Sequence, residues 1–272
     1  MNVARAEGDR IARKDEFEWL ARAGLVARGV VYGVIGLLAI KLALGESGGE
    51  TTDQKGALQE IAQQSFGKVL LALVAVGLFG YALWRLLRAA IGHGPEQADD
   101  TKDRIAGAVS GIAYAGLCVI SLTILFGSDS GGGGGSGPKK ATGGVLDWPA
   151  GQVIVFVAGA IMIGVGLDQG RRGLKKKFLK YSKTEQMGRR MRDAFTAVGV
   201  AGHLSRMVVF GLIGYFLIKA AIDFDPDKAV SVDGALAALA KASYGPVLLG
   251  IVAAGMISFA AYSVADARYR RV

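Results

Sequence analysis

The sequence has few of the residues that bind metals or form disulfides. It holds one cysteine, Cys118, and two histidines, His93 and His203, in 272 residues. A single cysteine excludes a disulfide within the chain and any multi-cysteine metal site. Neither histidine has a cysteine or a pair of acidic residues at ligand spacing, so we expect no metal site and no cofactor.

Motifs for catalysis are also missing. No glycine-rich phosphate loop follows a strand pattern, and no serine–histidine–aspartate set or carboxylate pair marks a pocket. The glycine run at 131–135 has no side chains to pack, and we interpret it as a flexible linker in an outer loop. We therefore expect that the protein is not an enzyme.

Charged residues are scarce within long apolar stretches. The mean hydropathy is +0.37, and 51% of the residues are apolar. A hydrocarbon core about 30 Å thick requires roughly 20 apolar residues in a helix, whereas strands of a membrane barrel are shorter and alternate in polarity. We predict an all-α integral membrane protein with six transmembrane helices, over residues 24–44, 66–91, 105–126, 151–167, 198–222 and 245–265.

The segments between these spans alternate in charge. Lysine and arginine are concentrated in residues 1–22, 85–104, 171–192 and 268–272, whereas the intervening segments are acidic or rich in glycine. Cytoplasmic loops carry the excess of basic residues. We predict a multi-pass membrane protein with both termini in the cytoplasm. Because the basic residues lie next to apolar spans, the net charge of +9 indicates contact with anionic lipid headgroups rather than nucleic acid.

The first and last thirds of the chain repeat each other. Shifting the sequence by 178 residues places Arg28 on Arg206 and Tyr81 on Phe259. At a shift of 82 residues the middle third is a diverged copy, in which Ser110 replaces the arginine. After a cytoplasmic segment at 1–22, we predict three tandem two-helix repeats at 23–91, 104–178 and 195–272. Repeats with an even number of spans share one orientation, so a pseudo-threefold axis along the membrane normal is expected.

The motif of the first repeat resembles that of a known family. Arg-Gly-x-x-Tyr-Gly-x-x-Gly occurs in the first helix, followed by Gly-Ala-Leu and by an aromatic residue and glycine that open the second helix. The pattern resembles the domain of unknown function 1206 family, uncharacterised bacterial membrane proteins with tandem two-helix repeats. The resemblance covers residues 19–91 and 199–268, and the middle third weakly. It implies the six-helix architecture and a place in the bacterial inner membrane, and it implies no activity.

Two arginines are the most informative polar residues. Arg28 and Arg206 each lie about one turn inside a span, where a charge is costly unless its side chain reaches the interface. Asp168 and Asp266 lie at a similar depth on other spans. We predict that at least one of these arginines pairs with one of these aspartates across helices. The alternative is that each arginine extends independently to the headgroups.

The predicted outer side contributes two further cations. Lys41 and Lys219 lie one turn from the outer face, where we expect their side chains to extend to the surface. A second interpretation is that they line a path for an anion or a lipid headgroup. The outer segments 53–64 and 231–243 read as amphipathic helices with apolar side chains facing lipid, namely Leu58, Ile61, Leu236 and Leu239.

The segment at 171–192, here called the basic loop, interleaves cations with apolar side chains. We expect it to bind anionic headgroups, and docking of a partner protein is the alternative. Its candidate lipid contacts are Arg171, Arg172, Lys175, Lys176, Lys177, Lys180, Arg189 and Arg190.

Small residues recur at close spacing within the spans, as in Gly29/Gly33, Gly107/Gly111, Ala160/Gly164 and Gly166/Gly170. We expect them to let helices approach closely inside the bundle, with self-association through the same faces as the alternative.

Two functions from different classes fit these observations. The first is a non-catalytic scaffold or accessory subunit, favoured by dry packing of glycine and alanine. The second is a small transporter or channel built on the threefold repeat, which requires polar residues converging on the axis. The sequence offers few such residues, so it favours the first function.

Overall fold

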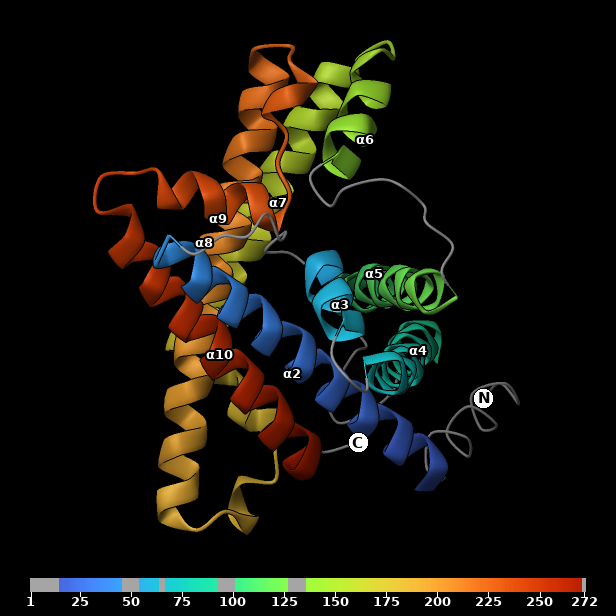
Figure 1. Ribbon diagram of the computed structural model, residues 1–272. Helices are drawn as coiled ribbons and strands as arrows, with labels where there is room; N and C mark the ends of the chain where they lie inside the picture. Colours follow the sequence, from blue (N-terminus) through green and yellow to red (C-terminus); the bar gives the residue numbers. More distant parts are fainter. Residues whose placement is uncertain (1–14, 46–53, 64–66, 92–100, 127–135, 271–272) are drawn as a thin grey trace.

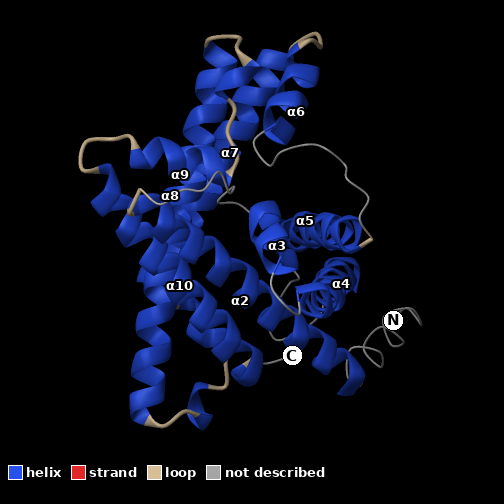
Figure 2. Cartoon of the chain, in the orientation of Figure 1, coloured by secondary structure: helices blue, strands red, loops and turns tan. Residues whose placement is uncertain are grey.

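The computed structural model describes residues 15–45, 54–63, 67–91, 101–126 and 136–270. Within these ranges the chain folds into helices joined by loops (Figure 2), and the only extended contact is an isolated bridge between Ser182 and Arg270. Six of the helices are long and apolar enough to cross a membrane. The predicted number and places of the spans are therefore confirmed, and the chain is a multi-pass membrane protein.

The spanning helices reach beyond the predicted apolar runs. They are α2 (Asp15–Ala43), α4 (Gly67–Ile91), α5 (Thr101–Leu125), α7 (Gly151–Leu174), α8 (Arg189–Ile222) and α10 (Gly245–Tyr269). Shorter helices lie between them: α3 (Gln54–Gln63), α6 (Ser136–Leu146), α9 (Val232–Ala240), η1 (Lys177–Tyr181), η2 (Thr184–Gln186) and η3 (Pro226–Lys228).

The three repeats exchange partners in a cycle. The first helix of each repeat packs along the second helix of the repeat before it: α5 on α4, α8 on α7, and α2 on α10. The three pairs run in different directions in Figure 1, where α7 and α8 run from top to bottom, α2 and α10 lie diagonally, and α4 and α5 are seen nearly end-on. Because the first repeat pairs with the last, the cycle of pairs follows the expected pseudo-threefold arrangement.

Glycines bring the two helices of the first and third repeats together. A Cβ built on Gly77 of α4 would lie 2.7 Å from Cβ of Ala27 in α2, and one on Gly24 would lie 2.8 Å from the carbonyl oxygen of Gly77. In the third repeat the same positions are Gly202 of α8 and Gly255 of α10, which meet Phe259 and Ser205. Backbones can approach this closely only because these positions carry no side chain.

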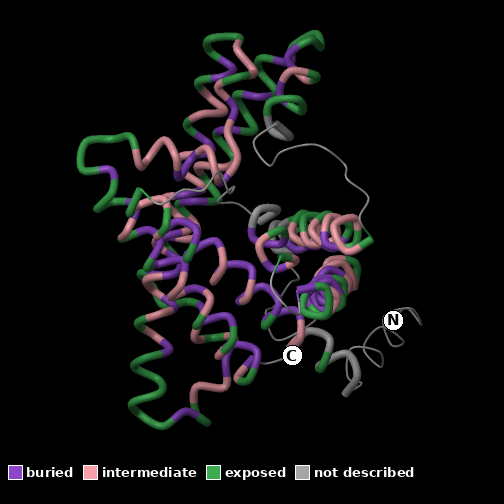
Figure 3. Tube along the Cα trace, viewed as in Figure 1, coloured by how far each residue is buried: buried purple, intermediate pink, exposed green. Residues whose placement is uncertain are grey.

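The middle repeat lacks this pair of glycines. Its second helix begins at Gly151, as α4 begins at Gly67, so the counterpart of Gly77 is Ile161, and the counterpart of Gly24 is Ala106. In the described part of the chain α5 and α7 make at most marginal contact, and both expose far more of their surface than α2 does (Figure 3). The cycle of helices is thus open between α5 and α7.

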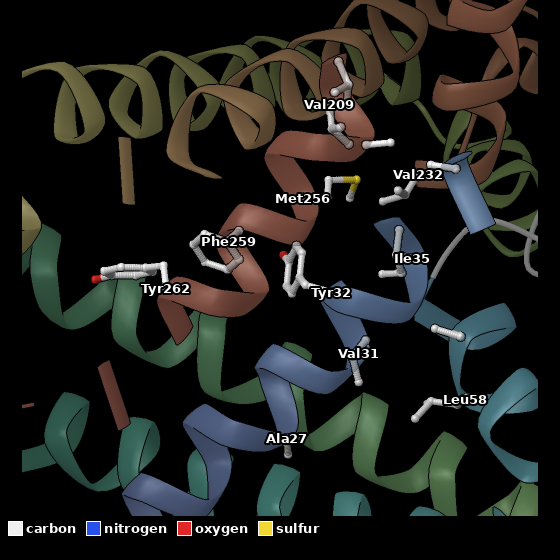
Figure 4. Packing of buried hydrophobic residues seen from close by; sticks show 14 of the residues in the cluster. Ala27, Val31, Tyr32, Ile35, Leu58, Val209, Val232, Met256, Phe259 and Tyr262 are labelled. Carbon is white, nitrogen blue, oxygen red and sulfur yellow. The ribbon is translucent and has the colours of Figure 1, made fainter. Parts of the chain in front are cut away.

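The centre of the bundle is apolar. Tyr32 and Ile35 of α2 pack against Met256 and Phe259 of α10, and Val209 of α8 closes the same cluster (Figure 4). The Tyr32 and Phe259 rings meet edge to face, with centroids 4.8 Å apart. Burying such a side chain away from water contributes about 1.5–3 kcal/mol to stability. Within a membrane the surroundings are already apolar, and close packing between helices stabilises the bundle instead.

The short helices face inward rather than toward lipid. Leu58 and Ile61 of α3 and Leu236 of α9 are buried in the core, so the expectation that they turn outward is wrong. α3 packs against α2, α4 and α5, and α9 packs against α8 and α10. Their apolar faces pack on core residues that the spanning helices leave exposed near their ends.

The middle repeat has a corresponding short helix that the sequence did not predict. α6 packs against α7 and η3. It was not predicted because it contains glycines and a proline, which are unfavourable in helices. The glycine run at 131–135 lies outside the described residues.

Substituting Gly255 with alanine tests the approach of α8 to α10. The added Cβ would lie 2.6 Å from Cβ of Ser205 and 3.2 Å from the carbonyl oxygen of Ala201, so we expect a loss of about 1–3 kcal/mol and a lower Tm in detergent. Gly250→Ala is the matched control in the same helix, because no described atom lies within 4 Å of its Cβ position. Equal stability of the two variants would contradict the glycine contact.

Candidate functional site

A cavity of about 100 Å³ lies at one end of the bundle. We call this the basic end: α2 and α8 begin here, and α4, α7 and α10 end here beside the basic loop. Residues of five spanning helices, of η1 and of the segment after α10 line the cavity, and no described aspartate or glutamate is among them. Five arginines line this arginine cavity: Arg28, Arg85, Arg172, Arg206 and Arg270.

Arg28 joins the first repeat to the third. Its side chain on α2 is buried, its Nε donates a hydrogen bond to Oγ of Ser263 at 3.2 Å, and its Nη1 donates to the Tyr81 hydroxyl at 3.1 Å. Its guanidinium carbon lies 5.0 Å from the ring centroid of Phe259. Hydrogen bonds and an aromatic face therefore replace a carboxylate as the partners of this cation.

Arg206 approaches the same aromatic ring. Its guanidinium carbon lies 4.7 Å from the Phe259 centroid and 5.5 Å from that of Tyr32. Its Nε is buried and makes no hydrogen bond within the described structure. Each arginine also lies over the ring at the same position of its own repeat, since Arg28 lies 5.5 Å from the Tyr81 centroid. Phe259 is thus shared by two cations.

Tyr81 connects a third arginine to this pair. Its hydroxyl accepts hydrogen bonds from Nε and Nη2 of Arg85 at 3.2 and 3.0 Å, in addition to the one from Arg28. The Tyr81 ring packs edge to face on Tyr114 of α5, with centroids 4.6 Å apart. α5 therefore packs against a residue that binds two of the arginines, although α5 does not line the cavity.

Each of the two aspartates has its partner four residues further along the chain. Asp168 pairs with Arg172, and Asp266 pairs with Arg270 at 3.0 Å. In the described residues neither aspartate forms an ion pair with Arg28 or Arg206, so the predicted pairing across helices is not formed. The physical reason is the helical repeat, which places residues four apart on one face. The Asp-x-x-x-Arg spacing was visible in the sequence.

The basic loop folds back over the cavity. Oγ of Ser182 donates to Asp266 at 3.0 Å, and the backbone N–H of Lys183 donates to the carbonyl of Tyr269 at 2.6 Å. The guanidinium of Arg270 lies 5.5 Å from the ring centroid of Tyr181. These contacts fix the segment after η1 to the end of α10, so the loop is part of the site and not only an anchor at the surface.

Phe178 of η1 closes the same wall from the side of α8. Its ring stacks on His203 with centroids 5.1 Å apart, and it meets Tyr262 edge to face at 5.2 Å. Nδ1 of His203 lies 2.7 Å from the carbonyl oxygen of Gly199, a hydrogen bond in which the ring nitrogen donates. This role of Phe178 could not be predicted from the sequence, because an apolar residue in a basic loop is typical of a membrane contact.

The remaining predicted cations lie elsewhere. Lys41 and Lys219 are exposed in the last turns of α2 and α8, at the opposite end from the arginine cavity. Of the candidate residues in the basic loop, Arg172 lines the cavity. The others are exposed: Arg171, Lys175, Lys176, Lys177, Lys180, Arg189 and Arg190. His93 lies outside the described residues.

Comparison with known proteins agrees with this repeated plan. The Domain of Unknown Function (DUF1206) family matches the chain three times, over residues 23–92, 105–176 and 201–270. The chain belongs to this family. A relative from Bacillus subtilis (strain 168), the uncharacterized protein YxxB, is 34% identical over 254 residues, which are 92% of this chain and 90% of the relative. No solved structure matches the chain.

The three DUF1206 units contribute unequally to the cavity. The first and third units each provide a lining arginine that lies over the ring at the equivalent position of its own unit, Arg28 over Tyr81 and Arg206 over Phe259. Phe259 lines the cavity, whereas Tyr81 lies next to it. The middle unit has Ser110 where the others have arginine, and it provides Gln169 and Arg172 from α7 instead. The site is therefore built by two family units and completed by the third.

Replacing Asp266 with alanine tests the contact between the loop and α10. Its side chain is fully buried against Arg270, which is 9% exposed, so removal should cost about 3–5 kcal/mol and speed tryptic cleavage within residues 175–190. Asp168→Ala removes an equivalent pair whose side chains are 47% and 41% exposed, and should cost about 1 kcal/mol or less. Similar losses of stability and similar cleavage rates in both variants would contradict the role of Asp266.

Proposed function

We propose that the protein is a non-catalytic integral membrane protein that binds an anion in the arginine cavity, as a scaffold or accessory subunit. One observation carries the proposal: five guanidinium groups line a cavity to which no described carboxylate contributes. Arginine is fully charged at any physiological pH, so the cavity is cationic under all such conditions.

The cost of burying these cations supports an anionic ligand. A single arginine costs about 2.5–3.5 kcal/mol at the centre of a membrane helix on insertion scales, and less near the end of a span, where Arg28 and Arg206 lie. Arg28 and Arg206 share Phe259 and form no ion pair in the described structure, so their repulsion adds to this cost. An anion between them offsets both terms, whereas Arg172 and Arg270 already have aspartates.

The charge distribution supports one orientation of the site. The Lys/Arg-rich basic loop lies at the basic end, which favours the cytoplasmic side of the bacterial inner membrane for this end, with both termini on that side. The exposed lysines and arginines of the basic loop support contact with anionic headgroups around the cavity. On this orientation the anion comes from the cytoplasm or from the inner leaflet.

The apolar centre of the bundle supports binding rather than transport. Beyond Phe259 toward the other end, Ile35, Met256 and Val209 pack together in the described core (Figure 4). A transporter or channel requires polar groups or space along the axis. In liposomes that contain the purified protein we therefore expect no sulfate or chloride flux above that of protein-free liposomes. Flux that depends on Arg206 would overturn the accessory role in favour of transport.

Anion binding is tested by thermal unfolding of the purified protein in detergent. A ligand that binds the folded state raises stability by RT ln(1 + [L]/Kd), so sulfate should raise the Tm of the wild type more than chloride at equal ionic strength. Arg206→Gln should lose most of this difference, while Arg171→Gln, which changes an exposed arginine outside the cavity, should keep it.

The comparison between variants is the decisive readout, because sulfate also stabilises proteins by its exclusion from their surfaces. That general effect is the same in both variants. An equal sulfate shift in Arg206→Gln and Arg171→Gln would contradict binding in the arginine cavity.

A further inference from the structure

We propose that the anion is a doubly charged phosphate group, such as that of a phosphomonoester, bound between Arg28 and Arg206 next to Phe259. The inference rests on the proposed anion-binding function and adds the chemical class of the ligand. Its arguments are the donors that the two arginines present, the charge of the cavity and the size of the cavity.

The donors suit a tetrahedral oxyanion. A guanidinium presents five N–H groups in a rigid plane that matches phosphate oxygens two at a time. Nε of Arg206 is buried and donates no hydrogen bond in the described structure. Arg28 uses Nε and Nη1 for Ser263 and Tyr81, which leaves its Nη2 for a ligand. Two arginines can therefore bind different oxygens of one phosphate.

The charge of the pair favours two negative charges over one. Both guanidinium carbons lie within 5.0 Å of the Phe259 centroid. A singly charged ligand, such as chloride or a phosphodiester, leaves one of these two cations without compensation. A phosphomonoester carries about −1.5 to −2 charges at neutral pH, which matches the pair.

The size of the cavity limits what can enter. About 100 Å³ is well below the roughly 300–1,000 Å³ of pockets that enclose drug-sized ligands. The cavity holds a phosphate group with little else, so any larger carrier stays outside. Two sources satisfy this condition, inorganic phosphate in solution and the headgroup of a phosphomonoester lipid such as phosphatidic acid.

The test measures binding to the full-length protein with two pairs of probes. In detergent, inorganic phosphate is compared with chloride by calorimetry. In nanodiscs, phosphatidic acid is compared with phosphatidylglycerol, a singly charged phosphodiester, by the shift in Tm. We expect the doubly charged probe to bind more strongly within at least one pair. Preference within the first pair identifies a soluble phosphate, and preference confined to the second identifies a lipid headgroup.

Variants place the ligand. Arg206→Gln should weaken phosphate binding about tenfold or more, as expected for a lost hydrogen bond between charged groups. Arg206→Lys keeps the charge and loses the paired donors, so it should also weaken binding, and it guards against misfolding of the glutamine variant. Lys241→Gln, which removes an exposed cation after α9 at the opposite end of the bundle, should bind as the wild type does.

The outcomes separate the two proposals. If chloride and phosphatidylglycerol bind as strongly as phosphate and phosphatidic acid, and Arg206→Gln loses them equally, the cavity binds anions but this inference is wrong. Full binding by Arg206→Lys overturns it as well, because charge alone then suffices. If no probe binds in a manner that depends on Arg206, the proposed function fails too.

Discussion

Two arginines that share one aromatic ring determine the structure of the basic end. Arg28 is buried and Arg206 is partly buried among the helices, and Phe259, Tyr81 and Ser263 supply the faces and acceptors that hold them. These partners come from the second helices of the first and third repeats. Glycines let these helices approach: Gly77 brings α4 to α2, Gly255 brings α10 to α8, and Gly29 brings α2 to α10. The same glycine contacts therefore determine both how the helices pack and where the arginines of the cavity lie.

Divergence of the middle repeat makes this arrangement asymmetric. Ser110 replaces the arginine, and Ile161 occupies the position of the packing glycine. Without that glycine α5 and α7 do not approach each other as the other two hairpins do, and the cycle stays open on their side. The repeat still contributes, since α7 provides Gln169 and Arg172 to the cavity and leads into the loop that covers it. A symmetric bundle with three buried arginines would concentrate more positive charge on the axis.

The sequence predicted those features that follow from local composition. Apolar length located the six spans, and the shift of 178 residues found the repeat and selected Arg28 and Arg206 as its polar positions. The sequence did not predict which residues become partners through contacts between distant helices. The aspartates pair with arginines four residues further along the chain, Leu58 and Leu236 turn inward, and each repeat packs on its neighbour. A hydrophobic face can be recognised from sequence, but the surface that covers it depends on helices far along the chain.

The central claim is that an anion binds between the two arginines. Selenate is a tetrahedral dianion whose anomalous scattering locates it in a crystal structure. We expect a selenium peak in the arginine cavity, placed so that selenate oxygens lie within hydrogen-bond distance of Nε of Arg206 and of Nη2 of Arg28. A structure in which selenate binds only along the exposed basic loop, and the arginine cavity shows no peak, would contradict it.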